Sequence, residues 1–106
     1  MLIDFKDEDF DSKIKNEDVS VIQFSAAWCG PCKSLKPIMD KFSEIYKDKA
    51  QNWFYCDVED GAINLGSQMF IKGVPTTIIF KKGVEIDRLV GNPGESAVKD
   101  FLEKNI

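Results

Sequence analysis

The sequence contains no histidine, and only three of its 106 residues are cysteine. A zinc or iron–sulfur site usually needs four ligands drawn from these residue types, so the chain is poorly supplied for a resident metal. Three cysteines also fall short of the paired disulfide framework that stabilises many small secreted domains. The cysteines therefore need another explanation.

Positive charge is also scarce, because 14 Lys and Arg residues face 18 Asp and Glu residues, for a net charge of −4. Without a basic cluster, nucleic acid and anionic membranes are poor candidate partners. No apolar run approaches the roughly 20 residues of a membrane-spanning helix, and residues 1–7 lack the pattern of a secretory signal. We expect a cytoplasmic protein, although a precursor whose signal had been removed would leave the same sequence.

Length and composition are those of one ordinary globular unit. Apolar residues make up 43% of the chain and charged residues 30%, and no repeat, linker or low-complexity tract interrupts it. A chain of this length can bury one core without a metal or disulfide staple. We expect a single domain over residues 1–106, and nothing in the sequence demands more than a monomer.

Hydrophobic periodicity predicts alternating strands and helices. Strands are predicted at 2–5, 19–25, 53–58, 76–80 and 84–90. Helices are predicted at about 7–15, from residue 32 onward, in a weaker segment holding Ile63 and Phe70, and around Val98, Phe101 and Leu102. The order βαβαβα followed by ββα predicts an α/β fold, with parallel strands joined by helical crossovers and a final hairpin covered by a helix. The Phe and Ile residues of the helices are predicted to lie in the core.

The most informative segment follows the apolar run 21–24 and has six residues: Trp28-Cys29-Gly30-Pro31-Cys32-Lys33. Two thiols three positions apart can close a small disulfide and reopen it. Cys29 stands where a helix begins, so the helix dipole and unpaired N–H groups should stabilise its thiolate. Cys32, one turn further on, should be more buried. We expect Cys29 to attack a partner's disulfide and Cys32 to release the reduced partner.

The neighbours of the two cysteines fit this chemistry. Gly30 permits close approach, and Pro31 suits a first helical turn while restricting the loop. Trp28 should cover one side of the pair, and Lys33 adds attraction for the thiolate if it folds back. Two other interpretations remain open: half of a metal site, for which Cys56 is the only further thiol, or a pair of unreactive core cysteines.

Residues 28–33, together with Gly73-Val74-Pro75-Thr76 and Val90-Gly91, closely resemble the thioredoxin family, and the resemblance covers essentially the whole chain. It implies the thioredoxin fold, a central mixed five-stranded sheet flanked by four helices. It also implies an enzyme that reduces protein disulfides without a bound cofactor and receives electrons from a separate thioredoxin reductase. Finally, it implies that Pro75 is cis and lies beside the cysteine pair.

In the family, a flat apolar surface around the cysteines docks partner proteins. The matching positions are Trp28, Gly30, Pro31, Val74, Pro75 and Gly91. Beside a cis Pro75, the Val74 backbone would be free to pair with an extended substrate segment, as an added strand does. The alternative function is a binding or chaperone-like subunit that grips such segments while redox turnover is secondary. Disulfide formation or isomerisation is less favoured, because Gly-Pro between the cysteines resembles the reducing members.

The chain departs from the family at a buried position. Thioredoxins usually carry an acid in the strand before the motif, and that position is Gln23 here; the lysine that commonly reaches toward it aligns with Tyr55, within about one residue. A glutamine amide forms hydrogen bonds but cannot titrate. We therefore expect Cys29 to titrate without a coupled carboxyl, Cys32 to resolve more slowly near neutrality, and Gln23→Asp to be less stable. Alternatively, Gln23 is a satisfied core amide with little effect on turnover.

Two further features have simple interpretations. Cys56 is predicted to be an inert buried thiol, with glutathionylation or oxidative dimerisation as the alternative if it is exposed. The acidic residues Asp57, Glu59 and Asp60 lack the spacing of a calcium loop, so a solvated helix start with a capping role is the better interpretation.

Overall fold

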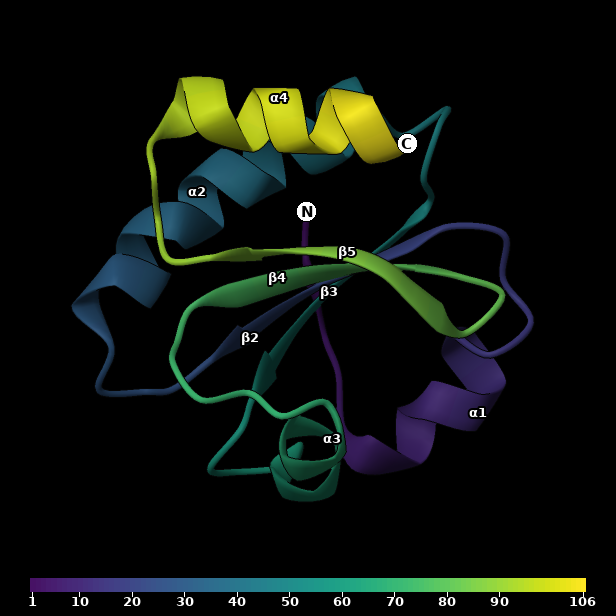
Figure 1. The fold of residues 1–106 in the computed structure, drawn as a ribbon, viewed down its shortest axis with the longest axis vertical. Coiled ribbons are helices and arrows are strands. Elements are labelled where there is room, and N and C mark those ends of the chain that lie inside the picture. The colour runs from purple at the N-terminus through teal and green to yellow at the C-terminus, as the bar shows by residue number, and fades with distance from the viewer.

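The computed structural model describes all 106 residues as a five-stranded mixed sheet with helices on both faces (Figure 1). The strands are β1 Ile3–Asp4, β2 Ser20–Ser25, β3 Asn52–Asp57, β4 Thr76–Lys81 and β5 Val84–Val90. The helices are the short 3₁₀ turn η1 Asp7–Asp9, then α1 Phe10–Lys13, α2 Gly30–Ile45, α3 Ile63–Gln68 and α4 Glu95–Asn105. The predicted α/β fold and element order are confirmed.

Strand order in the sheet is β1-β3-β2-β4-β5. The first three strands in this order are parallel, because helical connections return the chain to the same edge, whereas β4 runs antiparallel to β2 and β5 antiparallel to β4. The β4–β5 turn has positive φ at Lys82 and Gly83, which matches the twist of the two strands. This topology leaves β2 in the middle of the sheet, with its carboxyl end leading directly into α2.

The two faces of the sheet hold separate clusters of buried side chains. Val21 and Ile79 belong to the cluster shared with α2 and α4, while Ile22 and Ile78 belong to the cluster under α1 and α3. Figure 1 shows the same division, with α2 and α4 above the sheet and α1 and α3 below it. Because successive residues of a strand point to opposite faces, a continuous apolar run is what a strand buried on both sides requires.

Three expectations about the helices need correction. The first helix is split into η1 and α1 and ends before residue 15. The helix α3 ends at Gln68, and its buried residues are Leu65 and Gly66. The prediction that the Phe and Ile residues of the helices lie in the core is wrong for Ile45 of α2, which is 57% exposed. It is also wrong for Ile63 and Phe70, which are 58% and 76% exposed. A helix of six residues has one short face to bury, and these two side chains lie outside it.

The capping of α3 also differs from the expectation. The carboxylate of Asp7, near the N-terminus of the chain, accepts hydrogen bonds from the backbone N–H groups of Asn64 and Leu65. Asp57 instead accepts from the N–H of Glu59, within the turn that precedes the helix. A helix start leaves several N–H groups without partners inside the helix, and any nearby carboxylate can take them. Sequence neighbours are therefore not the only source of a cap.

No helix of the protein combines the length and the apolar character needed to cross a membrane.

Candidate active site

The start of α2 brings the two cysteines of the motif together. Cys29 is the residue that caps α2, with extended backbone, and Cys32 lies in the first turn of the helix. The backbone N–H of Cys32 donates to the sulfur of Cys29 over 3.1 Å. Helix starts leave such donors free, so the first sulfur takes the place that a serine or aspartate oxygen takes in other helices.

Cys29 and Cys32 form a disulfide whose Cα atoms are 5.3 Å apart, within the ordinary range for such bonds. Both residues are buried, and Ala26 and the partly buried Val74 pack against them. The disulfide that the spacing predicts is therefore present. The expected difference in burial is small, because Cys29 is 2% exposed and Cys32 is 0% exposed.

Residues far along the chain complete the site beside the first sulfur. The Val74–Pro75 peptide bond is cis, as the resemblance implies, and the carbonyl oxygen of Val74 lies 3.7 Å from the sulfur of Cys29. The N–H of Gly91 donates to the carbonyl of Pro75 over 2.7 Å. Gly91 has a φ of +85°, a backbone angle that residues with a side chain rarely adopt. The predicted site residues Val74, Pro75 and Gly91 are thus brought together with the cysteines.

The rim of the site consists of exposed residues. Trp28 is 68% exposed, and its indole N–H donates to the carboxylate of Glu59 over 2.8 Å. Sequence reasoning treated Glu59 only as an acid near a helix start and missed this role in holding the ring. Gly30, Pro31 and Lys33 are also exposed. A side chain at Gly30 would meet no atom within 4 Å, so glycine leaves open surface there without any packing need.

Gln23 lies behind the disulfide and is completely buried. Its side-chain N–H₂ donates to the hydroxyl of Ser25 and to the backbone carbonyl of Cys32, each over 3.1 Å. Its side-chain oxygen has no hydrogen-bond partner. The amide therefore ties β2 to the first turn of α2 as a donor, and sequence reasoning gave no indication of Ser25 as its second partner. A carboxylate cannot make these two donations.

Tyr55 is the direct neighbour of Gln23 across the β2–β3 pair. The ammonium of Lys36, from α2, lies 5.6 Å from the centre of the Tyr55 ring and 3.3 Å from a carboxylate oxygen of Asp40. An aromatic ring with a cation over its face and a neutral amide thus lie side by side on neighbouring strands. That these two residues replace the buried charge pair usual in the family stays a prediction.

Cys56 lies in β3, away from the pair, and is free and buried. Burial raises the pKa of its thiol above the ordinary value, and the negative charges of Asp7 and Asp57 act in the same direction. A thiol that resists ionisation is a poor nucleophile. This supports the prediction that Cys56 is inert.

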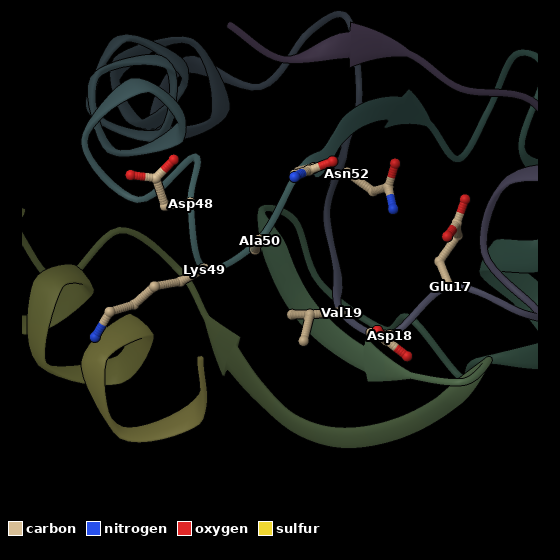
Figure 2. Close-up of a pocket in the computed structure, with 8 residues that line it drawn as sticks. Glu17, Asp18, Val19, Asp48, Lys49, Ala50 and Asn52 are labelled. Atoms are coloured by element: carbon tan, nitrogen blue, oxygen red, sulfur yellow. The ribbon is translucent and has the colours of Figure 1, made fainter.

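A hollow of about 240 Å³ lies at the other end of the sheet (Figure 2). It is lined by residues that flank the starts of β2 and β3: Glu17, Asp18, Val19, Asp48, Lys49, Ala50, Gln51 and Asn52. One of its carboxylates, Asp18, pairs with the ammonium of Lys82 over 2.8 Å. The structure contains no group of three His, Cys, Asp or Glu side chains placed to hold a metal ion.

Comparison with known proteins points the same way. The sequence profile of the family described as Thioredoxin matches residues 1–104. The thioredoxin of Staphylococcus aureus, and that of its strain COL, are each 30% identical over 105 residues, covering 99% of this chain and 98% of theirs. Both matches extend across nearly the whole chain. The chain therefore belongs to the thioredoxin family, and it is a dithiol–disulfide oxidoreductase that works by thiol–disulfide exchange.

Proposed function

We propose that this protein reduces disulfides of client proteins, with Cys29 as the attacking thiol and Cys32 as the resolving thiol. The observation that carries the proposal is the backbone N–H of Cys32, aimed at the Cys29 sulfur from 3.1 Å. A donor in this position stabilises a thiolate, which is the form that attacks disulfides. The positive end of the α2 dipole acts in the same direction.

In the first step, the Cys29 thiolate attacks one sulfur of the client disulfide. A bond forms between Cys29 and that sulfur, the client disulfide breaks, and the second client sulfur leaves as a thiolate that takes a proton. In the second step, Cys32 loses its proton and attacks the Cys29 sulfur. This closes the Cys29–Cys32 disulfide and releases the first client sulfur. The client gains two electrons and two protons, and the protein is oxidised by the same amount.

Electrons then have to return to the Cys29–Cys32 disulfide. The family acts on protein disulfides and is served by a reductase, and we assign a thioredoxin reductase to this chain as its electron donor. Two electrons delivered to the same disulfide restore both thiols, so the proposal needs no bound cofactor. Because both partners must reach the same Cys29–Cys32 disulfide, the reductase and the client would use one surface in turn.

The client segment would lie against the backbone of Val74, beside the cis Pro75. Val74 places a carbonyl beside the reacting sulfur, and an extended segment can pair with such a strand-like edge. Open space around Gly30, Gly73 and Gly91 supports this arrangement, since side chains there would meet no atom of the protein within 4 Å. Bare backbone of this kind allows another chain to approach closely.

Proton release from Cys32 distinguishes this protein from relatives with a buried acid. Gln23 contacts the Cys32 carbonyl but cannot take a proton. The resolving proton would go to solvent or to another base, so the second step should slow near neutrality and accelerate as pH rises. Single-turnover release of client thiol, measured from pH 6 to pH 9, tests this. A rate that is flat over that range would contradict it.

Insulin reduction tests the assignment of the two thiols. Cys29→Ser should abolish turnover, and Cys32→Ser should accumulate a mixed disulfide between Cys29 and insulin, visible on a non-reducing gel. Cys56→Ser is the matched control and should keep its activity. Turnover that persists in Cys29→Ser would contradict the assignment of Cys29 as the attacking thiol. Client binding that survives while wild-type turnover is absent would favour the chaperone-like alternative.

We also propose that the chain acts as a single domain and a monomer in the cytoplasm. The family profile spans nearly all of it, and a lone pair of close cysteines is typical of a catalytic couple in a reducing compartment. Sedimentation of the reduced and oxidised forms tests the monomer. Localisation of the tagged protein in its own cell tests the compartment.

A further inference from the structure

Phe70 has a backbone conformation that bulky side chains rarely adopt. Its φ is +56°, and it is one of two residues other than glycine with positive φ in the protein. Left-handed backbone is unfavourable for side chains with a Cβ, and for a large aromatic it is a clear outlier. Such an outlier calls for a local reason or a functional one.

The local geometry explains the conformation but not the residue. The N–H of Phe70 donates to the carbonyl of Ser67 over 3.1 Å, and the N–H of Ile71 donates to the carbonyl of Gly66 over 2.9 Å. This pair of bonds is the Schellman motif that ends a helix, and its left-handed position is usually glycine. Phenylalanine therefore occupies the position just after the C-terminus of α3, where glycine would be less strained.

The Phe70 side chain gains little from the protein in return. Its neighbours Met69 and Ile71 pack against the cluster below the sheet, whereas Phe70 is 76% exposed and belongs to no cluster. The other such residue, Lys82, has a φ of +52°, but its ammonium pairs with Asp18 and donates to the carbonyl of Asn16. Lys82 therefore has partners within the fold, and Phe70 lacks comparable ones.

Phe70 lies on the connection that also carries the cis proline. Figure 1 shows the segment from α3 to β4 running beneath the sheet to the side where β2 ends and α2 begins. Phe70 and Val74 are four positions apart in the sequence, so their Cα atoms are at most about 14 Å apart. The guanidinium of Arg88 donates to the carbonyl of Met69 and holds the start of this connection against β5. Phe70 thus lies on the same short connection as the proposed client contact at Val74.

We propose that Phe70 is a specificity-determining contact for an aromatic or large aliphatic side chain of the client polypeptide, about four residues from its reacting cysteine. This inference rests on the proposed function, because the client is the extended segment held beside Val74. The carbonyl of Val74 lies beside the Cys29 sulfur, so the client cysteine would react near Val74. An extended client chain advances about 3.3 Å per residue, so about four client residues span the largest possible separation of the Val74 and Phe70 Cα atoms. Paired aromatic side chains prefer each other beyond their buried area, which suits an exposed ring.

The test uses cysteine peptides joined by a disulfide to thionitrobenzoate, whose release is followed by its absorbance. Two peptides differ only in Phe or Ser four residues before the cysteine, and a second pair carries the same change four residues after it. The reduced wild-type protein should prefer one Phe peptide over its Ser partner by about fivefold in kcat/KM. Phe70→Gly should bring that ratio close to one, and Phe70→Tyr should keep it.

Controls separate docking from folding and from chemistry. Ile63→Ser removes an exposed apolar side chain at the start of α3 and should leave the peptide preference intact. Phe70→Gly should reduce free dithionitrobenzoate at the wild-type rate, and its thermal midpoint should rise by about 4 °C because glycine suits the helix end. A fall in the midpoint would mean that the ring supports the fold, and it would overturn the proposal.

Other outcomes also decide between the occupants. If wild type reduces the Phe and Ser peptides equally well in both pairs, the inference fails while the proposed function stands. If wild type reduces no peptide, the proposed function itself fails. If Phe70→Gly keeps the peptide preference but slows reduction by the electron-donating reductase, or abolishes self-association seen by sedimentation, the ring serves that partner and the proposal is overturned.

Discussion

Cys29 and Cys56 are the same residue type and equally buried, each 2% exposed, yet their surroundings favour opposite chemistry. A backbone N–H at the start of α2 points at the sulfur of Cys29. Around Cys56, removal from water raises the thiol pKa, and the negative charges of Asp7 and Asp57 raise it further. The reactivity of a cysteine in this protein thus depends on the dipoles and charges that face its sulfur, and solvent exposure does not separate the two.

The two regions also differ in what lies behind them. The cysteine pair is backed by an uncharged amide, Gln23, whose donors are used and whose oxygen is not. Cys56 is flanked by carboxylates that serve other purposes, since Asp7 caps α3 and Asp57 stabilises a turn. Changing each of these groups in turn tests whether it causes the difference between the two cysteines.

The largest expected effect comes from replacing the thiols of Cys29 and Cys56 by hydroxyls, each in a separate variant. Cys29→Ser should lower the rate of insulin reduction by about a thousandfold or more, because a serine at that place cannot take part in disulfide exchange. Cys56→Ser should change the rate by less than about twofold, since its thiol is not ionised. Equal losses in the two variants would show that the contrast between the sites is wrong.

Placing a carboxylate behind the pair should have the next largest effect. Gln23→Asp removes two hydrogen-bond donors and buries a charge, and we expect the free energy of unfolding to fall by about 3 kcal/mol. Gln23→Asn, which keeps an amide, is the matched control and should lose less. Urea unfolding at pH 7 measures both. The Asp variant should also make the Cys29 titration curve biphasic; an Asp variant as stable as the wild type, with an unchanged curve, refutes the expectation.

The raised pKa of Cys56 predicts how stability depends on pH. In the unfolded chain this thiol has its ordinary pKa of 9.0, whereas in the folded protein burial raises the pKa and keeps the thiol protonated to higher pH. Its stabilising contribution is therefore complete below that pH and declines as pH rises, by about 1.4 kcal/mol per pH unit. With the pair held oxidised, wild type should lose about 1 kcal/mol more than Cys56→Ala between about pH 8.5 and about pH 10. Parallel curves for the two proteins would show that Cys56 ionises freely in the fold.

Asp7 connects the second region to α3 and should give the smallest effect. Asp7→Ala removes the acceptor for the N–H groups of Asn64 and Leu65, and the free energy of unfolding should fall by about 1 kcal/mol. Asp7→Asn keeps one acceptor oxygen and should recover part of that loss. Both variants should also ease the ionisation of Cys56, which the preceding pH series would detect. An Ala variant with unchanged unfolding would mean that water replaces the carboxylate without cost.

Much of the site could be predicted because its signals are local. The spacing of Cys29 and Cys32 and the helix pattern after them required no knowledge of distant contacts. The partners of Gln23 were not predictable, because the Cys32 carbonyl and Ser25 hydroxyl meet its amide only when β2 and α2 are in place. Phe70 was wrongly placed in the core, because the hydrophobic pattern of the sequence does not show whether the helix includes this residue or ends before it.

The sequence by itself determined the alternation of strands and helices and the thiol pair at a strand-to-helix junction, since both depend on side-chain periodicity and close spacing along the chain. Only the tertiary structure decided that Gln23 donates to the Cys32 carbonyl, that Asp7 caps a helix more than fifty residues away, and that the ring of Phe70 faces solvent. These relations join segments distant in sequence, or depend on where a short helix ends. They are fixed by packing and hydrogen bonding across the whole fold, which local patterns do not encode.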